Sequence, residues 1–198
     1  MISAASPRTT IGIFVGGQGT RMGGVAKGLL HAPDSTETLL ERLVRQCARA
    51  APAAALFLVG QAAPYRALGL PHLNDDPADV GPIGGLRALL LRANADESEL
   101  ALALACDLPF LDASVISSLL LPISGAARVP FVEGRLQPLA AAYAPLATLN
   151  AVDRSLAVGK HALMHVLDQL GSALERLEVA DEHAHALRDW DTPEDIHR

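Results

Sequence analysis

The sequence predicts an α/β fold with a mostly parallel central sheet, and three observations support this prediction. Short apolar runs alternate along the 198 residues with longer segments whose apolar side chains recur at helical spacing. Half of the residues are hydrophobic, which is ample for a buried core, while aromatic residues make up only 4%. A core of Leu, Ala, Val and Ile is typical of helices that cover both faces of a parallel sheet. We expect one domain over residues 1–198, because the chain shows neither internal repeats nor a low-complexity linker.

The first half of the chain predicts three buried strands separated by helices. Residues 11–15 form an apolar run that ends at glycines, which is typical of a buried strand. Helical spacing over residues 38–50 predicts a helix with a capping box at its start. Residues 55–59 and 100–105 predict two further strands, and Pro82 is well placed to open a helix between them.

The second half of the chain predicts a less regular mixture of helices and strands. A turn at Glu133-Gly134-Arg135 suggests that the strands on its two sides pair with each other. A hydroxyl cap followed by proline at residues 192–193 predicts the start of a last helix. The expected elements are helices over 112–120, 146–156 and 161–170, and strands over 128–132, 136–143 and 174–179.

The segments that directly follow the predicted strands are the expected place for the chemistry. In open parallel sheets, ligands bind beyond the carboxyl ends of the strands. The four segments concerned are 16–28, 60–63, 74–85 and 106–109. We therefore expect these segments to lie together at one edge of the sheet.

Residues 16–28 read GGQGTRMGGVAKG, a glycine-rich loop that holds two cations and no acid. The loop is not a P-loop, because Lys27 follows Ala26 and precedes Gly28. The dinucleotide fingerprint is also broken, because Met22 stands where a small residue is needed. Bare main chain with Arg21 and Lys27 suits a polyphosphate. The alternative is a solvated surface loop, and the position directly after the first strand favours a site.

Carboxylates occupy two of these segments, and a further candidate lies near the end of the chain. Asp107 follows the strand over 100–105, and its hard oxygen atoms suit Mg²⁺, although a turn cap is the simpler alternative. Asp75, Asp76 and Asp79 precede the G-P-I-G-G segment, where they could bind a metal or hydroxyl groups or form a solvated turn. Asp191 could be a second metal contact or the cap of the last helix.

Charge and cysteine content exclude several classes of protein. The net charge of −6 argues against a general nucleic-acid binder, which would usually show a basic face. Cys47 and Cys106 are too few for a disulfide framework, so we expect a reduced, cytoplasmic protein. No apolar segment is long enough for a secretion signal or a membrane span, so we expect no membrane partner.

Taken together, five motifs resemble those of the molybdenum cofactor guanylyltransferases. The segment F-V-G-G-x-G-T-R-M-G-G-V-x-K-G-L-L at 14–30 resembles their opening L-A-G-G-x-x-x-R-M-G-G-x-D-K. The segments G-P-I-G-G-L at 81–86 and C-D-L-P-F at 106–110 resemble G-P-L-A-G and C-D-x-P-[FY]. R-L-Q-P-L-A-A-A-Y at 135–143 and D-T-P-E-D at 191–195 follow in the family's order. The resemblance runs over nearly the whole chain, and its specificity lies in the combination.

The resemblance implies a Rossmann-like three-layer nucleotidyltransferase fold and a Mg²⁺-dependent transfer of GMP from GTP to molybdopterin. It implies GTP and molybdopterin as substrates, and transient contacts with molybdoenzymes or cofactor-assembly proteins. It assigns Lys27, Arg21 and Asp107 to catalysis, and these three residues would also bind the nucleotide. The other nucleotide-binding groups are the main chain of Phe14, Val15, Gly16 and Gly17, and Asp75, with Asp76 as the second choice. Asp107, joined by Asp191, would bind the metal, and residues 137–138 and 189–191 would face the pterin.

The chain departs from the family pattern at several positions. Phe14-Val15 replaces Leu-Ala, Ala26 replaces an aspartate, and Asp189 and Asp191 stand where the family commonly has asparagine. These changes bear on base choice and activity more than on fold, and G-P-I-G-G favours the guanylyl branch. The alternatives are a transferase that uses CTP or another acceptor, such as a sugar phosphate, and a non-catalytic nucleotide-binding adaptor. The broken fingerprint argues against a dinucleotide-dependent oxidoreductase.

Overall fold

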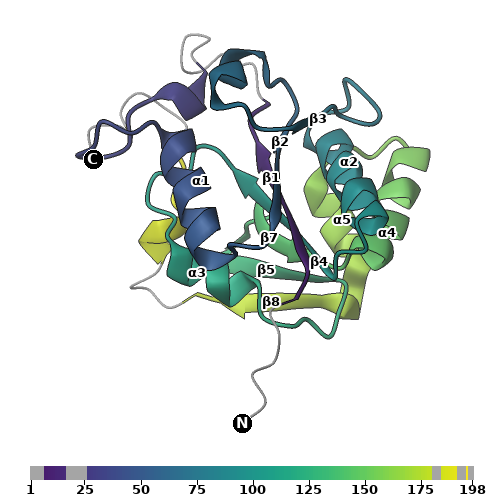
Figure 1. Cartoon of the computed structure of the whole chain (residues 1–198). Coiled ribbons are helices and arrows are strands. Elements are labelled where there is room, and N and C mark those ends of the chain that lie inside the picture. Colours follow the sequence, from purple (N-terminus) through teal and green to yellow (C-terminus); the bar gives the residue numbers. More distant parts are fainter. Residues whose placement is uncertain (1–6, 17–25, 180–183, 191–194, 196–198) are drawn as a thin grey trace.

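The computed structural model describes residues 7–16, 26–179, 184–190 and 195, and Figure 1 shows how its elements are arranged. The strands are β1 (Thr9–Phe14), β2 (Ala55–Val59), β3 (His72–Leu73), β4 (Leu100–Ala105), β5 (Ala127–Val132), β6 (Arg135–Leu136), β7 (Ala140–Tyr143) and β8 (Leu174–Glu178). The helices are α1 (Leu39–Ala50), α2 (Pro82–Ala95), α3 (Ala113–Leu119), α4 (Pro145–Ala157) and α5 (Leu163–Leu170). Short 3-10 turns cover Lys27–Leu29, Ala63–Leu68, Gly171–Ala173 and His185–Leu187.

All eight described strands join one sheet, in the order β3-β2-β1-β4-β7-β5-β6, with β8 paired to β5. β1 runs parallel to β2 and β4, β2 is parallel to β3, and β5 is parallel to β8. Two strands are antiparallel to their neighbours: β7 lies antiparallel between β4 and β5, and β6 pairs antiparallel with β5. The parallel part of the sheet therefore directs the ends of β1, β2, β3 and β4 to one edge.

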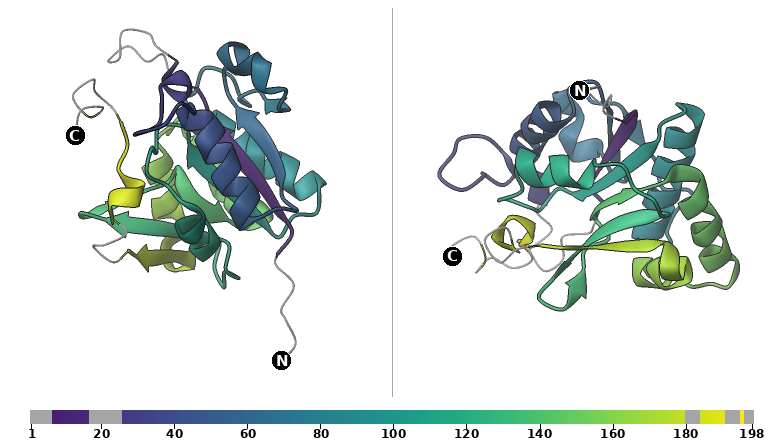
Figure 2. Two further views of the ribbon diagram at one scale, coloured as in Figure 1. Left: turned by 60° about the vertical axis from the view of Figure 1, so that its left-hand side comes forward. Right: turned by 90° about the horizontal axis from the view of Figure 1, so that it is seen from below.

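Helices cover both faces of the sheet, as Figures 1 and 2 show. α1 and α3 lie on one face, and α2, α4 and α5 lie on the other. Side chains along a strand point alternately to the two faces. Ile11 and Ile13 of β1 accordingly pack with the core on the α1 face, whereas Phe14 packs with the core on the α2 face. The predicted α/β class, with a Rossmann-like layered arrangement and a mostly parallel sheet, is confirmed.

Local signals explain where several helices begin. Thr38 caps α1, and its side chain and that of Glu41 satisfy each other's main-chain N–H groups in the predicted capping box. The Asp112 carboxylate accepts the N–H groups of Ser114 and Val115 in the first turn of α3. Pro82 is the first residue of α2, where a missing N–H leaves no hydrogen bond unmade.

Three details differ from the sequence-based expectation. The single strand expected over 136–143 is two strands, because Pro138 lies between β6 and β7 and cannot donate to a ladder. β3 was not expected, and its two residues are too short to give a periodic signal. α5 begins at Leu163, later than the predicted start at residue 161. The helix start expected at residues 192–193 lies outside the described residues.

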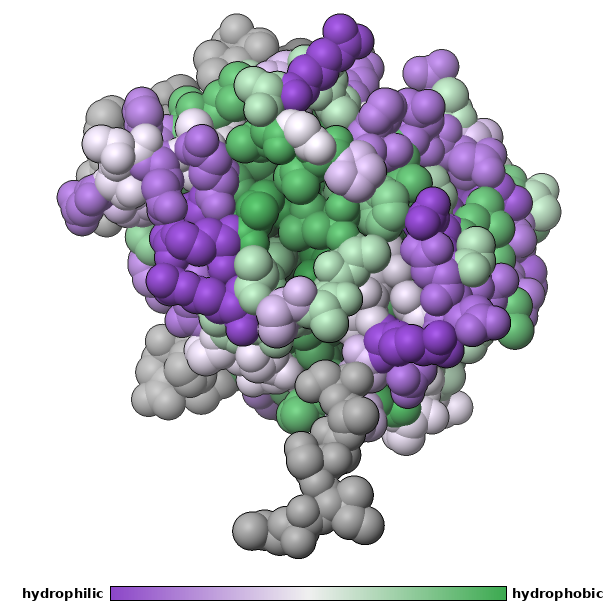
Figure 3. Space-filling view, in the orientation of Figure 1, coloured by the Kyte–Doolittle hydropathy of each residue, from purple (hydrophilic) through white to green (hydrophobic). Residues whose placement is uncertain are grey.

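The surface between α1 and α2 is largely hydrophobic in Figure 3, where β2 lies between these helices in Figure 1. Partly buried side chains of β2 and of the turn after it, Leu56, Leu68 and Leu70 among them, pack against the α1-face core.

Within the described ranges, no helix combines the length and the apolar character needed to cross a lipid bilayer.

Candidate active site

The ends of β1, β2 and β4 meet closely at one edge of the sheet. A Cβ added to Gly60, which follows β2, would lie only 3.2 Å from the Cα of Gly16, which comes shortly after β1. Gly60 also has a φ of +93°, a conformation that side chains rarely adopt. The N–H of Cys106, directly after β4, donates to the carbonyl of Phe14 at 3.1 Å. The post-strand segments predicted to carry the chemistry therefore do lie together in their described parts.

Sheet hydrogen bonds use part of the main chain that was expected to line a nucleotide. The Phe14 carbonyl is engaged by Cys106, and the Val15 N–H donates to the carbonyl of Val59 at 3.0 Å. Both side chains are buried, Phe14 toward α2 and Val15 toward α1. Gly16 is the second residue after β1, and its nearest neighbours on the side-chain side are main-chain atoms: a Cβ added there would lie 3.7 Å from the Cα of Gly60.

An ion pair joins the glycine-rich loop to the loop after β4. The Lys27 Nζ lies 2.7 Å from the Asp107 Oδ2, and the two side chains are only 18% and 17% exposed. These residues are 80 positions apart in the sequence. The structure thus brings together the best basic and the best acidic candidate of the sequence analysis.

A small buried polar cluster lies beside this ion pair. The Gly28 N–H donates to the Tyr65 hydroxyl at 3.2 Å, and the hydroxyl lies close to the thiol of Cys106. Burial raises the pKa of Tyr65 to about 12 and that of the Cys106 thiol to about 12. Both groups are therefore neutral near pH 7, and Cys106 is not poised to act as a nucleophile. Sequence reasoning did not identify Tyr65, because it lies just beyond the segment expected after β2.

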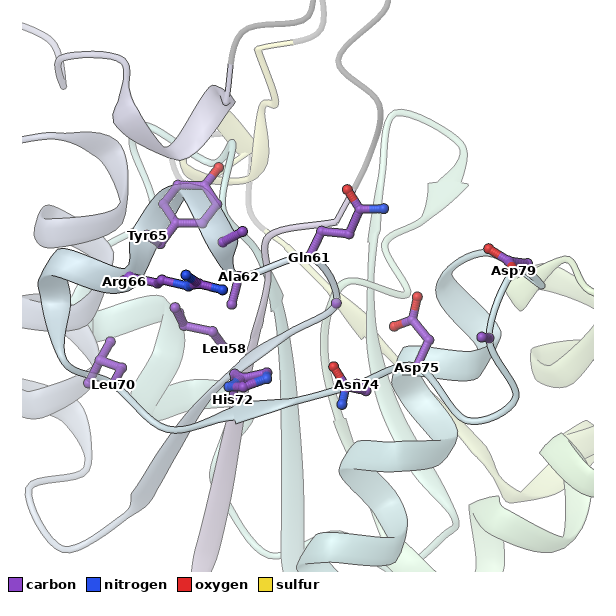
Figure 4. A pocket seen from close by; sticks show the side chains of 13 residues that line it. Leu58, Gln61, Ala62, Tyr65, Arg66, Leu70, His72, Asn74, Asp75 and Asp79 are labelled. Carbon is purple, nitrogen blue, oxygen red and sulfur yellow. The ribbon is translucent and has the colours of Figure 1, made fainter.

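A pocket of about 600 Å³ opens beside this edge, along β2 and β3. Figure 4 shows Tyr65 on one side of the pocket and Asp75 and Asp79 on the other, with Gln61 and Asn74 between them. Small residues make room for Asp75, since a Cβ on Gly85 would lie 3.0 Å from the Asp75 Oδ1. Burial, and secondarily the negative charge of the nearby Asp79 carboxylate, raises the pKa of Asp75.

Asp75 and its neighbour Asp76 have different environments. The Asp76 carboxylate binds Arg87 at 2.5 Å and is more than half exposed. Arg87 donates as well to Asp153 at 2.7 Å, so that it joins the loop before α2 to α4. Of the two acids considered for the nucleotide, Asp75 lines the pocket, while Asp76 is held in a surface ion-pair network.

The two segments expected to face the pterin both border the loop that carries Asp107. The Ala105 N–H donates to the carbonyl of Leu139, which follows residues 137–138, at 2.7 Å. The Trp190 N–H donates to the Asp107 carbonyl at 3.0 Å. The ring of His185 stacks on Phe110 with ring centres 3.8 Å apart. Residues near the end of the chain thus reach the site, and no local pattern predicted the aromatic contact.

Some of the predicted site residues lie outside the part of the chain that the structure describes, namely Gly17, Arg21 and Asp191. Among the described residues, no group of three or more His, Cys, Asp and Glu side chains is arranged to hold a metal ion. A lone carboxylate such as Asp107 still fits Mg²⁺, which commonly keeps several waters and binds through one or two carboxylates together with substrate phosphates.

Comparison with known proteins gives three consistent results. A family model described as the MobA-like NTP transferase domain matches residues 11–174. A molybdenum cofactor guanylyltransferase of Pseudomonas putida is 30% identical, over 96% of both chains. One of Cereibacter sphaeroides is 31% identical, over 94% of this chain and 92% of its own length.

Solved structures share the fold at low sequence identity. Molybdopterin-guanine dinucleotide biosynthesis protein A of Archaeoglobus fulgidus superimposes with a TM-score of 0.74 at 20% identity, over 96% of this chain and 95% of that one. The 2-C-methyl-D-erythritol 4-phosphate cytidylyltransferase of Thermus thermophilus gives a TM-score of 0.63 at 17% identity, over 94% of both chains.

Proposed function

This chain belongs to the MobA-like NTP transferase domain family, and from that premise we propose that it transfers GMP from GTP to molybdopterin, releasing pyrophosphate. It is a nucleotidyltransferase, as its full-length relatives are by name. GTP and molybdopterin are the substrates of the proposed reaction, and Mg²⁺ is its cofactor. Delivery of the product to molybdoenzymes or assembly proteins is also part of the proposal.

The observation that carries the proposal is the pairing of Lys27 with Asp107 at 2.7 Å. A cation from a glycine-rich loop and a carboxylate from the end of a parallel strand are the two charges that a metal-bound polyphosphate needs. Both side chains are mostly buried, and charges act more strongly in such a place than in bulk water. This arrangement supports a triphosphate lying between the loop and the end of β4.

In the proposed reaction, an oxygen of the molybdopterin phosphate attacks the α-phosphorus of GTP. The new P–O bond forms as the bond from the α-phosphorus to the bridging oxygen breaks, and pyrophosphate leaves with that oxygen. Such a step needs little covalent help from a protein, and depends on positioning and on charge neutralisation. Lys27, joined by Arg21, would offset the charge that grows on the departing pyrophosphate. Asp107 would hold Mg²⁺, whose charge supplements these cations when it is bound.

The environment of Asp75 supports guanine as the base. A carboxylate only accepts hydrogen bonds, and guanine presents two adjacent donors, the ring N–H and the exocyclic amine. Cytosine and adenine present an amine next to a ring nitrogen that only accepts hydrogen bonds. The lone pair of that nitrogen would be repelled by a carboxylate oxygen. Asp75 lines the pocket, where burial and the nearby Asp79 carboxylate raise its pKa and so disfavour its negative charge. A partner with two donors would satisfy both of its oxygens.

The experiment that tests the proposal is pyrophosphate release from each of GTP, CTP, UTP and ATP, with and without molybdopterin and Mg²⁺. We expect release with GTP only when both molybdopterin and Mg²⁺ are present. Efficient use of CTP with poor use of GTP would establish the cytidylyl alternative. Release that requires an added sugar phosphate in place of molybdopterin would establish the sugar-phosphate alternative. Binding of GTP with no release under any condition would indicate a nucleotide-binding adaptor.

A cytoplasmic location is part of the same proposal. It rests on the two cysteines of the chain, Cys47 and Cys106, which are both free and buried. Unpaired thiols are typical of proteins that work in a reducing compartment.

A further inference from the structure

Tyr65 contacts the neighbours of both members of the ion pair. Its hydroxyl accepts the N–H of Gly28, the residue after Lys27, and lies close to the thiol of Cys106, the residue before Asp107. One phenol oxygen therefore joins the two loops that carry the opposite charges of the site.

The packing around Tyr65 leaves this oxygen little freedom. The residue is only 2% exposed and belongs to the core on the α1 face. Its ring lies so close to Gly28 that a Cβ there would be 2.9 Å from the Tyr65 Cε1. The ring also forms one end of the pocket, opposite Asp75 (Figure 4). The buried ring of Tyr65 thus holds its hydroxyl at a fixed place next to the main chain of Gly28.

We infer that Tyr65 is a positioning residue for the transfer reaction, because its hydroxyl fixes the main chain at Gly28 and thereby holds Lys27 against Asp107. This inference deepens the proposed function and rests on it for the nature of the bound nucleotide. Tyr65 acts through Lys27 and need not touch the reacting atoms. Lysine side chains are flexible, so that the position of the ammonium depends on how firmly its main chain is held.

The test begins with Tyr65→Phe, which removes the hydroxyl and keeps the ring. The Gly28 N–H then loses the acceptor that lies 3.2 Å from it in wild type. We expect its hydrogen exchange, followed by nuclear magnetic resonance, to quicken by roughly fivefold, the equivalent of one ordinary hydrogen bond. Unchanged exchange at Gly28 would overturn the inference, and this readout requires no enzymatic activity.

A double-mutant cycle separates positioning from general stability. In wild type, Tyr65→Phe should weaken GTP binding by roughly fivefold to tenfold and leave guanosine binding unchanged. In a Lys27→Met background, the same change should have no further effect on GTP binding, since the group it positions is gone. An equal loss in both backgrounds would show that Tyr65 does not act through Lys27, and would overturn the inference.

Thr148→Val is the matched control. It also removes one buried hydroxyl, which donates to the Ala126 carbonyl over 2.7 Å. Thr148 belongs to α4, on the opposite face of the sheet (Figure 1). We expect it to lower stability without changing GTP binding or exchange at Gly28.

Failure of the wild-type protein to bind GTP would overturn the proposed function. The role of Tyr65 in positioning Lys27 would then be tested by unfolding measurements, which need no ligand. Urea midpoints of Tyr65→Phe, Lys27→Met and the double variant measure the coupling directly. If Tyr65 orders Lys27, the double variant should lose less stability than the two single variants together. Additive losses would overturn the inference.

Discussion

Replacing Lys27 with methionine tests the charged centre of the site most directly. Methionine keeps an unbranched apolar stem but removes the ammonium, so the Asp107 carboxylate loses the positive charge 2.7 Å from it. That carboxylate is in a side chain only 17% exposed, and water can therefore replace little of the lost interaction. Removal of the ammonium should consequently lower both the stability of the fold and the rate of the reaction.

The structure sets the size of both effects. Breaking a fully buried ion pair costs about 3–5 kcal/mol, and exposed pairs contribute about 0–1 kcal/mol. Because the Lys27–Asp107 pair is mostly but not fully buried, we expect a loss of about 2 kcal/mol in the free energy of unfolding. For a chain of this length, such a loss lowers the Tm by roughly 4–8 °C. Loss of one group that stabilises the transition state should also lower kcat by about 10²–10³-fold.

A second ion pair of the same length provides the control. Arg45 and Glu37 are joined at 2.7 Å, but their side chains are 38% and 37% exposed. Arg45→Met should therefore cost less than about 1 kcal/mol and leave turnover unchanged. Comparison of the two variants isolates the effect of burial and of the site, because the distance between the charges is the same.

Urea unfolding and pyrophosphate release supply the measurements. Trp190 is the single tryptophan of the chain and is only 4% exposed, so its fluorescence should report unfolding. The reasoning would be refuted if Lys27→Met were as stable as Arg45→Met, or if its turnover remained within about fivefold of wild type.

Three further changes test other parts of the site. Asp75→Asn should weaken GTP binding in calorimetry. Because burial raises the pKa of Asp75, its negative charge destabilises the fold at pH values above the ordinary aspartate pKa. The variant should therefore have a higher Tm than wild type at neutral pH, and this difference should disappear on acidification. Gly84→Ala should lose about 1–3 kcal/mol in urea unfolding, since its Cβ would overlap the Pro77 carbonyl oxygen; full stability would contradict this packing. Arg87→Met should lose at most about 1 kcal/mol, because the two carboxylates it joins are about half exposed, and a difference from wild type that survives 1 M salt would argue against an electrostatic origin.

Most of the layered fold could be predicted from the sequence, because its signals are local. Apolar runs gave β1, β2 and β4, and hydroxyl, carboxylate and proline signals gave the starts of α1, α2 and α3. The meeting of Lys27 and Asp107 also followed, since each comes after a strand and parallel strands end at the same edge.

The remaining features depend on contacts between distant parts of the chain. No local pattern tells that β7 returns antiparallel between β4 and β5, because that depends on the path of the chain after the turn at Glu133-Gly134. Tyr65 lies 37 residues from its partner Gly28, and its sequence neighbours give no sign that its hydroxyl would be buried. The family resemblance favoured Asp75 over Asp76 for the nucleotide, but only the structure shows that Arg87 binds Asp76 while Asp75 lines the pocket.

The contact between Trp190 and Asp107 has a practical consequence for shortened versions of the protein. The family match ends at residue 174, and the last described strand ends at Glu178, so a domain boundary drawn there would keep every strand of the sheet. It would nevertheless remove Trp190, whose main-chain N–H donates to the Asp107 carbonyl and whose side chain packs with Ala32 and Leu39. A truncated enzyme could thus fold and still fail to work, and expression of this family member should extend to the final residues.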